Sequence, residues 1–481
     1  MITKRFLLAA LASLLIWMPA AGPVFAETQD QSGNGQARWH EVYEILLEHH
    51  VSAPDGDDLA EAAIEGMIES LNDPYTEYFT PEELENFQNS VNQTYVGVGI
   101  QLGVSEDRFY VDRVFEGSPA AESKVLPGDT IAEIDGKSIE GWELEQVSGA
   151  IRGQEGTKVK LTLLRGGRRI EVELTRRQVT IPAVSVKRLD GRTAYVQLTT
   201  FSQDAGMKMR EVLQELEKEG LEALVLDLRD NPGGYLQTAR EIAAMFIDRG
   251  ELMLTKNRDG VQRPLLIFGG RDPDYQVVVL VNGNSASASE VLAGALQDHQ
   301  AAVLVGEKTF GKGSVQSLVK LESGGALKVT IEEYYTPAGH PVNGVGITPD
   351  VPVSGRISQL LMALHQTGAG SLNVRIRANS TRIQEAEFSD VVPVIQENGN
   401  VYVPSRVLAA MVGEPVAWDA SAQAAVIGSG EETVAFRAGT VRAKLVQGIS
   451  FIELDAFRQA YPAFSWEADE DGIRMTVTKE R

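Results

Sequence analysis

Residues 276–291 read QVVVLVNGNSASASEV, an apolar run that leads through an Asn-Gly-Asn turn into three serines separated by alanines. The apolar run predicts a buried strand, and the residues after the serines predict a helix. A strand-to-helix corner of this kind places a serine hydroxyl beside the unpaired N–H groups of the helix start, which is the geometry of a nucleophile elbow. Ser287 and Glu290 also have the spacing of a capping box, so helix capping is the alternative interpretation of the corner.

The corner belongs to an alternation of strands and helices between residues 180 and 353. Helical patterns at residues 204–219 and 236–246 separate the strand-like runs AYVQLTTF (194–201), ALVLDLR (223–229) and QVVVLV (276–281). Elements of this length predict right-handed crossovers and a mostly parallel sheet. Ligand sites on such sheets gather at the carboxyl ends of strands, where the turn DNPGG (230–234) and the serine corner are both found.

The periodicity changes on either side of this α/β region. Residues 37–93 show helical periodicity, and residues 95–179 show short alternating strands with glycine turns. Near the C-terminus, a strand, helix and strand pattern at residues 398–428 is repeated at 447–477, and the two copies are expected to pack into one α+β domain. The predicted fold class is therefore multidomain, α/β and α+β. The expected parts are a signal peptide (1–26), a linker and helical N-terminal region (27–93), a β-rich domain (94–179), an α/β core (180–360) and the C-terminal repeat domain (361–481).

The N-terminus has the features of a secretory signal. Lys4 and Arg5 precede the apolar stretch 6–17, and small residues lead up to Ala26. Because the apolar stretch is shorter than the ~20 residues that span a bilayer, cleavage after Ala26 is expected, with retention as an anchor as the alternative. The expected location is outside the cytoplasm, either secreted or associated with the cell envelope.

Charge and composition exclude several classes of function. The formal net charge of −23 argues against binding to nucleic acid. The six histidines are scattered and show none of the spacings of a zinc site, so no metal is expected. The chain contains no cysteine, which excludes both thiol chemistry and stabilisation by disulfides.

A serine nucleophile needs a base within reach. His299 lies twelve residues after Ser287 on the predicted helix, about 18 Å away at the rise of an α-helix, so these two residues cannot form a pair. His340 remains an isolated candidate. A lysine whose pKa is lowered by burial is the other known solution, because its neutral amine can accept the serine proton.

Residues 303–321, VLVGEKTFGKGSVQSLVKL, offer three lysines: Lys308, Lys312 and Lys320. Lys312 lies between two glycines in a loop before a predicted strand, where the backbone can come close to a substrate. Gln316, four residues further on, is in a position to orient the lysine amine by hydrogen bonding. The two glycines of the DNPGG turn are candidate backbone donors for an oxyanion hole.

Several motifs together resemble one protein family. Residues 283–316 resemble the active-site block of the carboxyl-terminal processing peptidases, also called tail-specific proteases, a family of secreted Ser–Lys endopeptidases. Further similarity occurs in the family's order across roughly residues 40–360, in GMIESLNDPYTEYFTPEE, GSPAAESKVLPGDTIAEIDG, AIRGQEGTKV, DLRDNPGGYL and YYTPAGHPVNGVGITPDVPV. The resemblance implies a crotonase- or Clp-like α/β protease core that needs no cofactor.

The resemblance also implies roles for individual residues. It matches Ser287 to the nucleophile that forms an acyl-enzyme, Lys312 to the general base, and Gln316 to the residue that supports the base. The implied oxyanion donors are the backbone N–H groups of Ala288 and Gly233, with the second glycine of the DNPGG turn as the alternative to Gly233.

Residues 95–179 resemble the PDZ module of the same family. PDZ domains add a peptide strand to a sheet edge and hold its terminal carboxylate on loop N–H groups. The resemblance implies that the substrates are proteins with exposed or unstructured C-termini. It matches Arg152 to an arginine that links PDZ occupancy to assembly of the active site, with an ordinary surface arginine as the alternative. The carboxylate-binding loop is matched to Tyr95, Val96, Gly97, Val98 and Gly99.

The C-terminal repeat resembles a different domain. YVPSRVLAAMVGEPVAWD (402–419) is similar to the small stalk-like domain named from the N-terminus of copper amine oxidases, which recurs in surface proteins of spore-forming Gram-positive bacteria. Copper is not implied, because no ligand set is present. Association with the cell wall or membrane is expected from this resemblance, and a homodimer through the helical N-terminal region is expected from the peptidase family.

The sequence therefore predicts an exported serine endopeptidase that selects substrates by their C-termini. One alternative is a non-catalytic binding scaffold with a PDZ module on a peptidase fold, against which the presence of Ser287, Lys312 and Gln316 argues. The other alternative is a crotonase-type acyl-CoA enzyme, against which the predicted signal argues, because coenzyme A is intracellular.

Overall fold

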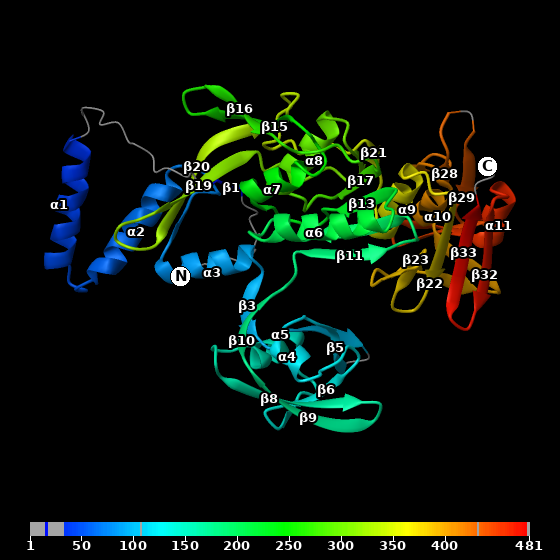
Figure 1. The fold of residues 1–481 in the computed structure, drawn as a ribbon, viewed down its shortest axis with the longest axis horizontal. Helices are drawn as coiled ribbons and strands as arrows, with labels where there is room; N and C mark the ends of the chain where they lie inside the picture. The colour runs from blue at the N-terminus through cyan, green and yellow to red at the C-terminus, as the bar shows by residue number, and fades with distance from the viewer. Residues whose placement is uncertain (1–14, 18–32, 106–107, 431, 479–481) are drawn as a thin grey trace. The chain divides into compact units, whose positions relative to one another are not determined.

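The computed structural model describes residues 15–17, 33–105, 108–430 and 432–478 (Figure 1). The chain forms two compact units, and each is described by itself below. Unit 1 contains residues up to 85 and residues 229–366, and unit 2 contains residues 86–228 and those from 367 onward. Most of the expected signal peptide, including its predicted cleavage site at Ala26, lies outside the described residues.

The N-terminal region is helical, as its periodicity predicts. Its helices are α1 (Gly33–His49), α2 (Gly56–Glu69) and α3 (Pro81–Val91). A capping box starts α3, because the Glu83 N–H donates to Thr80 Oγ1 (3.3 Å) and the Thr80 N–H donates to Glu83 Oε2 (2.9 Å). In the described part of the chain, no helix is long and apolar enough to cross a membrane.

Unit 1 contains one parallel and one largely antiparallel sheet. The parallel strands are β17 (Gln276–Val281), which the strand and helix alternation predicts, β18 (Val303–Gly306) and β21 (Val351–Pro352). The second sheet adds antiparallel strands, of which the sequence predicted the one that follows the Lys312 loop. These are β15 (Gly250–Asn257), β16 (Gln262–Ile267), β19 (Ser314–Lys320) and β20 (Ala326–Tyr335), with β2 (Glu77–Phe79) paired to β20.

A short parallel strand completes this second sheet. β1 (Leu15–Trp17) lies between β14 (Gly234–Tyr235) and β19, with Leu15 opposite Gly234 and Ile16 opposite Gln316. The sheet therefore places Gly234, the last residue of the DNPGG turn, on one side of β1 and Gln316 on the other side.

Three helices pack on the sheets of unit 1. They are α7 (Leu236–Ala243), α8 (Ala288–Asp298) and α9 (Arg356–Gln366). α8 contacts α7, β15 and β18, while α9 contacts β17 and β18. Every residue of α8 from Ala288 to Leu296 is buried as a result, so the serine corner before this helix is held in the interior of the unit.

The α/β elements of unit 2 follow the predicted alternation. They are β11 (Val184–Arg188), β12 (Thr193–Leu198), α6 (Ala205–Lys218) and β13 (Ala223–Asp227). β12 and β13 are parallel, and β11 pairs antiparallel with β12. The five residues of β13 are all buried, which explains their continuous apolar sequence ending in Asp227.

Residues 94–180 of unit 2 form a β-rich domain with its own core. Its apolar core gathers side chains such as Val111, Val147, Leu161 and Leu163, which are almost fully buried. The larger sheet has the order β4-β5-β6-β8-β9, with β7 beside β6, and β3 pairs with β10. The elements are β3 (Thr94–Gly97), β4 (Ile100–Ser105), β5 (Arg108–Val114), α4 (Pro119–Glu122), β6 (Thr130–Ile134), β7 (Lys137–Ser138), α5 (Leu144–Ile151), β8 (Lys158–Arg165), β9 (Arg168–Thr175) and β10 (Arg177–Thr180).

The C-terminal repeat forms two similar halves, as predicted. In the first half β26 (Asn400–Pro404) leads into α10 (Ser405–Val412) and the hairpin β27–β28; in the second, β31 (Ile449–Glu453) leads into α11 (Leu454–Ala460) and the hairpin β32–β33. The two halves join because β26 and β31 pair antiparallel. The remaining strands are β22 (Ser371–Ile376), β23 (Thr381–Ile383), β24 (Ala386–Phe388), β25 (Ile395–Glu397), β27 (Val416–Asp419), β28 (Ala424–Ile427), β29 (Val434–Arg437), β30 (Ala443–Val446), β32 (Phe464–Asp469) and β33 (Gly472–Thr478).

Candidate active site

The DNPGG turn and the serine corner lie in direct contact in unit 1. The backbone carbonyl of Asn231 accepts hydrogen bonds from the Ala286 N–H (3.1 Å) and from Ser289 Oγ (2.8 Å). The Asp230 carboxylate accepts a further bond from Asn284 Nδ2 (2.9 Å). The two corners selected from the sequence are therefore two sides of one site.

Ser287 has the backbone geometry of a strained corner. Its φ of 58° and ψ of −116° lie in a region that residues with a side chain rarely adopt. Gly233 lies against it so closely that a Cβ on Gly233 would be 2.9 Å from both Ser287 Cβ and the Ala288 nitrogen. Gly233 also has a φ of 107°, so both the close approach and the backbone conformation require glycine there.

Hydrogen bonding distinguishes the three serines of the corner, all of which are buried. Ser285 Oγ accepts from the Asn282 N–H (3.0 Å), and Ser289 Oγ donates to the Asn231 carbonyl. Ser287 Oγ, by contrast, has no hydrogen-bond partner among the described residues. Ser285 and Ser289 therefore hold the corner together, and the hydroxyl of Ser287 stays available.

A buried carboxylate joins the serine corner to the lysine loop. Glu290 Oε2 accepts from the backbone N–H groups of Ser287 (2.8 Å) and Lys312 (2.9 Å), and Oε1 accepts from Thr309 Oγ1 and the Gly311 N–H (both 2.6 Å). The capping box predicted from the spacing of Ser287 and Glu290 is present at the start of α8, where the Glu290 carboxylate accepts from the Ser287 N–H and the Ser287 side chain faces the Glu290 N–H. The same carboxylate also fixes the loop that carries Lys312, a role that its sequence spacing did not indicate.

Tyr334 on β20 makes a second link between the two segments. Its hydroxyl donates to the carbonyl oxygens of Lys312 (2.8 Å) and Ser287 (3.3 Å). Complete burial raises the pKa of Tyr334 well above its ordinary value, so the hydroxyl keeps its proton for these bonds. Glu290 and Tyr334 together bring the main chains of Ser287 and Lys312 to one place.

Lys312 is almost fully buried, unlike the exposed Lys308 and Lys320 of the same segment. Burial is the main cause that lowers the pKa of Lys312 from 10.5 to about 7; the nearby Lys328 contributes to this shift, and Asp73 and Glu290 oppose it. A substantial fraction of the amine is therefore neutral near pH 7, which is the form that can accept a proton.

Gln316 lies on β19 beside this loop and is completely buried. Its Nε2 donates to Ser314 Oγ (2.9 Å) and Thr330 Oγ1 (3.3 Å). Its Oε1 has no hydrogen-bond partner among the described residues, the Lys312 amine included. The expected hydrogen bond between the two side chains is therefore still a prediction, although the acceptor oxygen is available for it.

The two expected oxyanion donors differ in their surroundings. Ala288 is the first residue of α8, where backbone N–H groups have no partner within the helix. The Gly233 N–H instead donates to Asn231 Oδ1 (2.9 Å). Gly233 can therefore act as an oxyanion donor only if its N–H breaks the hydrogen bond to Asn231 Oδ1. Gly234, the alternative donor, belongs to β14.

The histidines considered as bases are not part of this site. His299 lies at the end of α8, where its Nε2 contacts the Glu251 carbonyl (2.8 Å), and His340 is exposed. The N-terminal segment contributes instead, because the ring of Tyr75 lies 4.6 Å from Lys312 Nζ. Tyr75 belongs to the motif GMIESLNDPYTEYFTPEE, which resembles the peptidase family. This motif was the only feature of the sequence that pointed to Tyr75.

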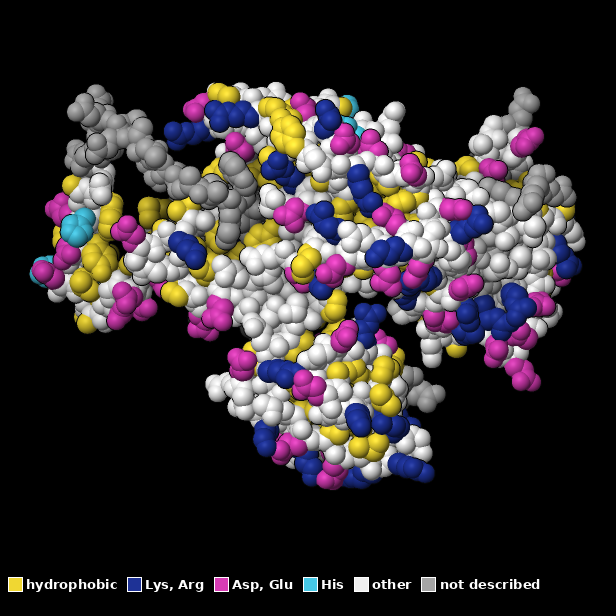
Figure 2. All heavy atoms as spheres, viewed as in Figure 1, with side chains coloured by type: hydrophobic (Ala, Val, Ile, Leu, Met, Phe, Trp, Pro, Cys, Tyr) yellow, Lys and Arg dark blue, Asp and Glu magenta, His cyan; other side chains and the backbone are white. Residues whose placement is uncertain are grey.

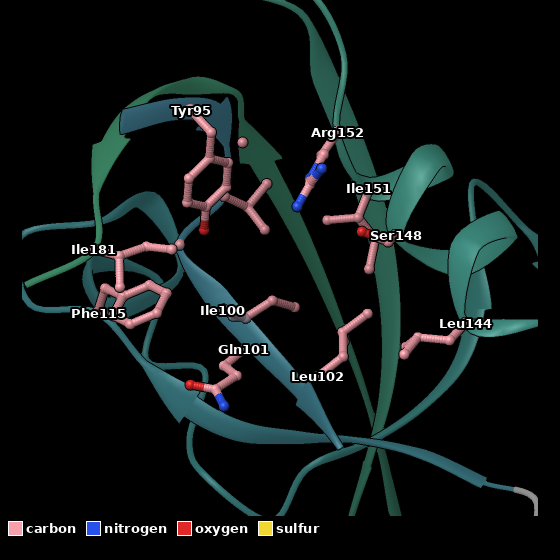
Figure 3. A pocket seen from close by; sticks show the side chains of 13 residues that line it. Tyr95, Ile100, Gln101, Leu102, Phe115, Leu144, Ser148, Ile151, Arg152 and Ile181 are labelled. Atoms are coloured by element: carbon pink, nitrogen blue, oxygen red, sulfur yellow. The ribbon is translucent and has the colours of Figure 1, made fainter. Parts of the chain in front are cut away.

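A groove of about 280 Å³ in unit 2 contains the predicted peptide-binding residues of the β-rich domain. Figure 3 shows Ile100, Leu102 and Leu144 pointing into the space between β4 and α5. Arg152, at the end of α5, lies over the Tyr95 ring (5.5 Å) at one end of the groove. Val96 lies on β3 beside the groove, whose lining is Tyr95, Gly97, Val98, Gly99, Ile100, Gln101, Leu102, Phe115, Leu144, Ser148, Ile151, Arg152 and Ile181.

The chain matches four known protein families along its length. Residues 23–83 match the "Activating protease CtpB N-terminal domain", residues 86–164 the "PDZ domain" and residues 192–353 "Peptidase family S41". Residues 381–459 match the "Copper amine oxidase N-terminal domain".

Individual relatives agree with these matches. A probable CtpA-like serine protease of Staphylococcus aureus strain N315 is 37% identical over 377 residues, which cover 74% of this chain and 76% of that protein. For the corresponding protein of strain COL the match covers 68% of this chain and 66% of that protein. A carboxy-terminal-processing protease of Bartonella bacilliformis is 36% identical over 325 residues, covering 66% of this chain and 74% of that protein.

Among solved structures, the photosystem II D1 C-terminal processing protease is 32% identical to this chain. The alignment covers 71% of this chain and 93% of that protein, with a TM-score of 0.42. The sequence relatives and the family matches confirm the resemblance seen in the motifs. The chain belongs to peptidase family S41, among the carboxyl-terminal processing serine proteases that carry a PDZ domain.

Proposed function

We propose that the protein is an exported endopeptidase that cleaves peptide bonds through an acyl-enzyme on Ser287, with Lys312 as general base. The observation that carries this proposal is the arrangement around Glu290. The Glu290 carboxylate accepts hydrogen bonds from the main-chain N–H groups of both Ser287 and Lys312. Of the three serines in the corner, only Ser287 has a hydroxyl without a hydrogen-bond partner among the described residues. Lys312 is buried, and its pKa is about 7.

The first half of the reaction forms the acyl-enzyme. The neutral Lys312 amine takes the proton from Ser287 Oγ as this oxygen bonds to the carbonyl carbon of the substrate. When the tetrahedral intermediate collapses, the peptide C–N bond breaks and the Lys312 ammonium returns its proton to the departing amine. The N-terminal part of the substrate is then an ester on Ser287, and the C-terminal part is free to leave.

The second half hydrolyses this ester. Lys312 takes a proton from a water molecule, the water oxygen bonds to the acyl carbon, and the C–O bond to Ser287 breaks. Lys312 then returns the proton to Ser287 Oγ, so the starting state is restored without any other reactant. In both halves, charge on the intermediate oxygen is stabilised by the N–H of Ala288 and by Gly233 or Gly234 of the DNPGG turn.

The strand position next to the site suggests how a substrate backbone would lie. β1 occupies the space between β14 and β19 and runs parallel to both. An extended peptide thus finds backbone pairing partners on two sides, next to Gly234 and Gln316. We propose that the scissile segment of a substrate binds in this extended form, as peptides do in strand-addition complexes.

We propose that substrates are first selected by their C-termini at the PDZ groove. The apolar lining of the groove, including Ile100, Leu102 and Leu144, favours apolar residues near the terminus. In the proposed complex the peptide adds a strand beside β4, and its carboxylate meets the loop of residues 95–99 close to Arg152. The proposed substrates are therefore proteins with exposed or unstructured C-termini.

We propose that the protein acts outside the cytoplasm, as its N-terminal sequence predicts. The C-terminal domain, whose match to the copper amine oxidase N-terminal domain is independent of the peptidase match, supports attachment at the cell envelope. This attachment is proposed as binding to the cell wall or to the membrane surface.

We also propose a homodimer formed through α1. Trp39, Val42, Ile45 and Leu46 recur on one side of this helix and are each more than a third exposed. Figure 2 shows these apolar side chains gathered along α1 among charged residues. An apolar stripe on an exposed helix is typical of a surface that pairs with another protein, and a second copy of this chain offers the same stripe.

The test of catalysis compares the mature chain with Ser287→Ala, Lys312→Ala and the matched control Ser285→Ala. Each protein is incubated with an unfolded protein substrate in the presence of a chelator, and the products are mapped by mass spectrometry. We expect cleavage by the parent and by Ser285→Ala, and none by the other two. Equal cleavage by all four proteins contradicts the catalytic assignment, and equal inactivity with retained binding of C-terminal peptides indicates a non-catalytic scaffold.

A further inference from the structure

The site of Lys312 is completed by a segment from the N-terminal region, residues 73–79. This segment is anchored on β20, where Glu77 pairs with Lys328 in the strand register and the Thr330 N–H donates to Thr76 Oγ1 (3.2 Å). β20 in turn pairs with β19, in which Gln316 lies opposite Thr330. A segment more than two hundred residues away in the sequence is therefore fixed to the same strands that carry Gln316.

Tyr75 presents its ring to the lysine amine. The distance from Lys312 Nζ to the ring centre is 4.6 Å, within the range in which a cation is attracted to an aromatic face. The ring therefore restricts where the amine can move, and it favours the ammonium form relative to an aliphatic side chain of similar size. Burial raises the pKa of Tyr75 itself, so its hydroxyl remains protonated.

Asp73 supplies a negative charge on the same side. Although burial by itself raises the pKa of Asp73, hydrogen bonds from Thr76 Oγ1 (2.6 Å), Thr330 and the Tyr75 N–H (3.0 Å) lower it below its ordinary value. The carboxylate is therefore ionised at neutral pH, and it attracts the ammonium form of Lys312.

Lys328 supplies the opposing positive charge. Its side chain is 3% exposed, forms an ion pair with Glu77 (2.6 Å) and lies over the Phe79 ring (5.2 Å). After burial, Lys328 is the strongest influence that lowers the pKa of Lys312. Its position on β20 and its pairing with Glu77 hold this charge at a constant place.

The groups that face Lys312 come from three elements. Asp73 and Tyr75 belong to the N-terminal segment, Lys328 and Tyr334 to β20, and Glu290 to α8. Glu290 and Tyr334 bind the main chain on the side of Ser287. The N-terminal segment and Lys328 remain as the groups that act on the amine itself, through the ring of Tyr75 and the charges of Asp73 and Lys328.

We propose that Tyr75, Asp73 and Lys328 are positioning residues for the general base: the Tyr75 ring contacts its amine, the Asp73 carboxylate attracts the ammonium form and Lys328 repels it, so that the two protonation states are balanced. The proposal rests on the proposed function, in which Lys312 is the base. It assigns the N-terminal segment a direct part in the chemistry, through the amine and without contact to the substrate.

The test uses two charge-removing variants with opposite expected signs. Asp73→Asn removes the attracting charge, so the rising limb of kcat/KM against pH is expected to move to lower pH. Lys328→Met removes the repelling charge, so the limb is expected to move to higher pH. Each shift is expected to be of the order of one pH unit, the size produced by a nearby charge. Glu82→Gln, which removes an exposed carboxylate from α3, is the matched control and is expected to leave the limb in place.

A second readout reports the amine without any proteolysis. In a Ser287→Ala background, brief treatment with acetic anhydride at a series of pH values gives the fraction of Lys312 that is acetylated, measured by mass spectrometry. Tyr75→Leu is expected to move this titration to lower pH, because the aromatic face that favours the ammonium is lost, whereas Tyr75→Phe keeps it near the parent value. Circular dichroism confirms that each variant is folded.

The two readouts separate this proposal from the proposed function. Opposite shifts of the acetylation midpoint in Asp73→Asn and Lys328→Met support the proposal even if the parent cleaves nothing, in which case the proposed function fails alone. Midpoints that stay unchanged, or that move in the same direction in both folded variants, overturn the proposal and leave residues 73–79 with a purely structural role.

Discussion

Ser287 and its two neighbouring serines show how a single hydrogen bond decides the role of a residue. Ser285 Oγ and Ser289 Oγ are both used to tie the corner to Asn282 and Asn231, while Ser287 Oγ is left without a partner in the described structure. Two of the three serines therefore support the corner, and the hydroxyl of the third is available for the proposed chemistry. The bonds to Asn282 and Asn231 contribute roughly 1 kcal/mol each to stability, which is typical for neutral hydrogen bonds.

Glu290→Gln tests the residue that joins the serine and lysine segments. Glu290 accepts four hydrogen bonds, and a glutamine can accept only on its one oxygen, so at least one buried N–H is left without an acceptor. We expect kcat to fall much more than KM rises, and the free energy of unfolding to fall by about 1–3 kcal/mol. Steady-state kinetics and urea denaturation provide the measurement. The exposed Glu307→Gln should change neither, and a Glu290→Gln protein with normal kcat would contradict the role assigned to this carboxylate.

Lys312→Met tests how the buried lysine changes the free energy of unfolding with pH. The pKa of Lys312 is about 7 in the folded protein and 10.5 ordinarily, so between these values the unfolded chain holds a proton that the folded protein has released. The parent is therefore expected to gain stability as pH rises from 7 to 9, at about 1.4 kcal/mol per pH unit relative to Lys312→Met. Urea denaturation of both proteins at pH 7, 8 and 9 gives this difference. A difference that does not change with pH shows that the amine titrates normally in the folded state.

At the scale of elements, the turn between β13 and β14 lies against the start of α8, so closely that a side chain on the turn at Gly233 would not fit. Gly233 provides this approach through its φ of 107° and its contact with Ser287 and Ala288. The backbone nitrogen of Ala288 at the helix start is then close to the turn, in which the Gly233 N–H donates to Asn231 Oδ1. This contact between two short loops is the element of the fold on which an oxyanion site depends.

Gly233→Ala is expected to abolish most activity and to lower stability. The new Cβ would lie 2.9 Å from Ser287 Cβ and from the Ala288 nitrogen, and the φ of 107° is unfavourable for alanine. A loss of about 1–3 kcal/mol is typical of such strain. Gly283→Ala in the same corner is the matched control, because its nearest neighbour would be 3.9 Å away. Activity assays with thermal melting decide the matter, and full activity in Gly233→Ala would place the oxyanion donors elsewhere.

The groove between β4 and α5 can be tested with two leucines that are both 39% exposed. Leu144 lines the groove, whereas Leu164 on β8 does not. Leu144→Glu is expected to weaken the binding of apolar C-terminal peptides at least tenfold, because a charge replaces an apolar contact, and Leu164→Glu is expected to have no effect. Fluorescence anisotropy with a labelled peptide measures the affinities. Equal affinities for both variants would mean that peptides bind at another surface.

At the scale of the whole molecule, the exposed apolar side chains on α1 are the ones that recur on one side of a helix. The stripe on α1 is the most concentrated of the exposed apolar side chains in the described N-terminal region. Its position on a helix with few contacts within the chain agrees with a role in assembly. The net charge of −23 keeps the remaining surface soluble.

Ile45→Glu is expected to convert the proposed dimer to a monomer. The substitution introduces a charge into the centre of the apolar stripe, where its burial against a second copy would be costly. Light scattering after size-exclusion chromatography gives the mass of the particle. Val441→Glu, at a more exposed apolar residue in the C-terminal domain, should leave the mass unchanged. A parent protein that is already monomeric at micromolar concentration contradicts the dimer.

The sequence by itself determined the family, the order of the parts and the fold class of this protein. It could do so because strand and helix periodicity, caps and motifs such as DNPGG are local patterns, and they remain readable without knowledge of what packs against them. The parallel strands and both halves of the C-terminal repeat were predicted for this reason. The strand after the Lys312 loop, β19, was predicted. The antiparallel strands β15, β16 and β20 were missed, because their mixed apolar and charged residues lack the continuous apolar runs that mark the parallel strands.

The tertiary structure alone decided which side chains surround the candidate site. The burial of Lys312, the use of Ser285 and Ser289 for support and the bonds of Glu290 to both segments depend on contacts between distant parts of the chain. The approach of Tyr75 to Lys312 spans more than two hundred residues of sequence. Burial changes the solvation of a charge, and solvation sets its pKa, so the chemical state of the lysine is a property of the folded protein and not of its sequence position.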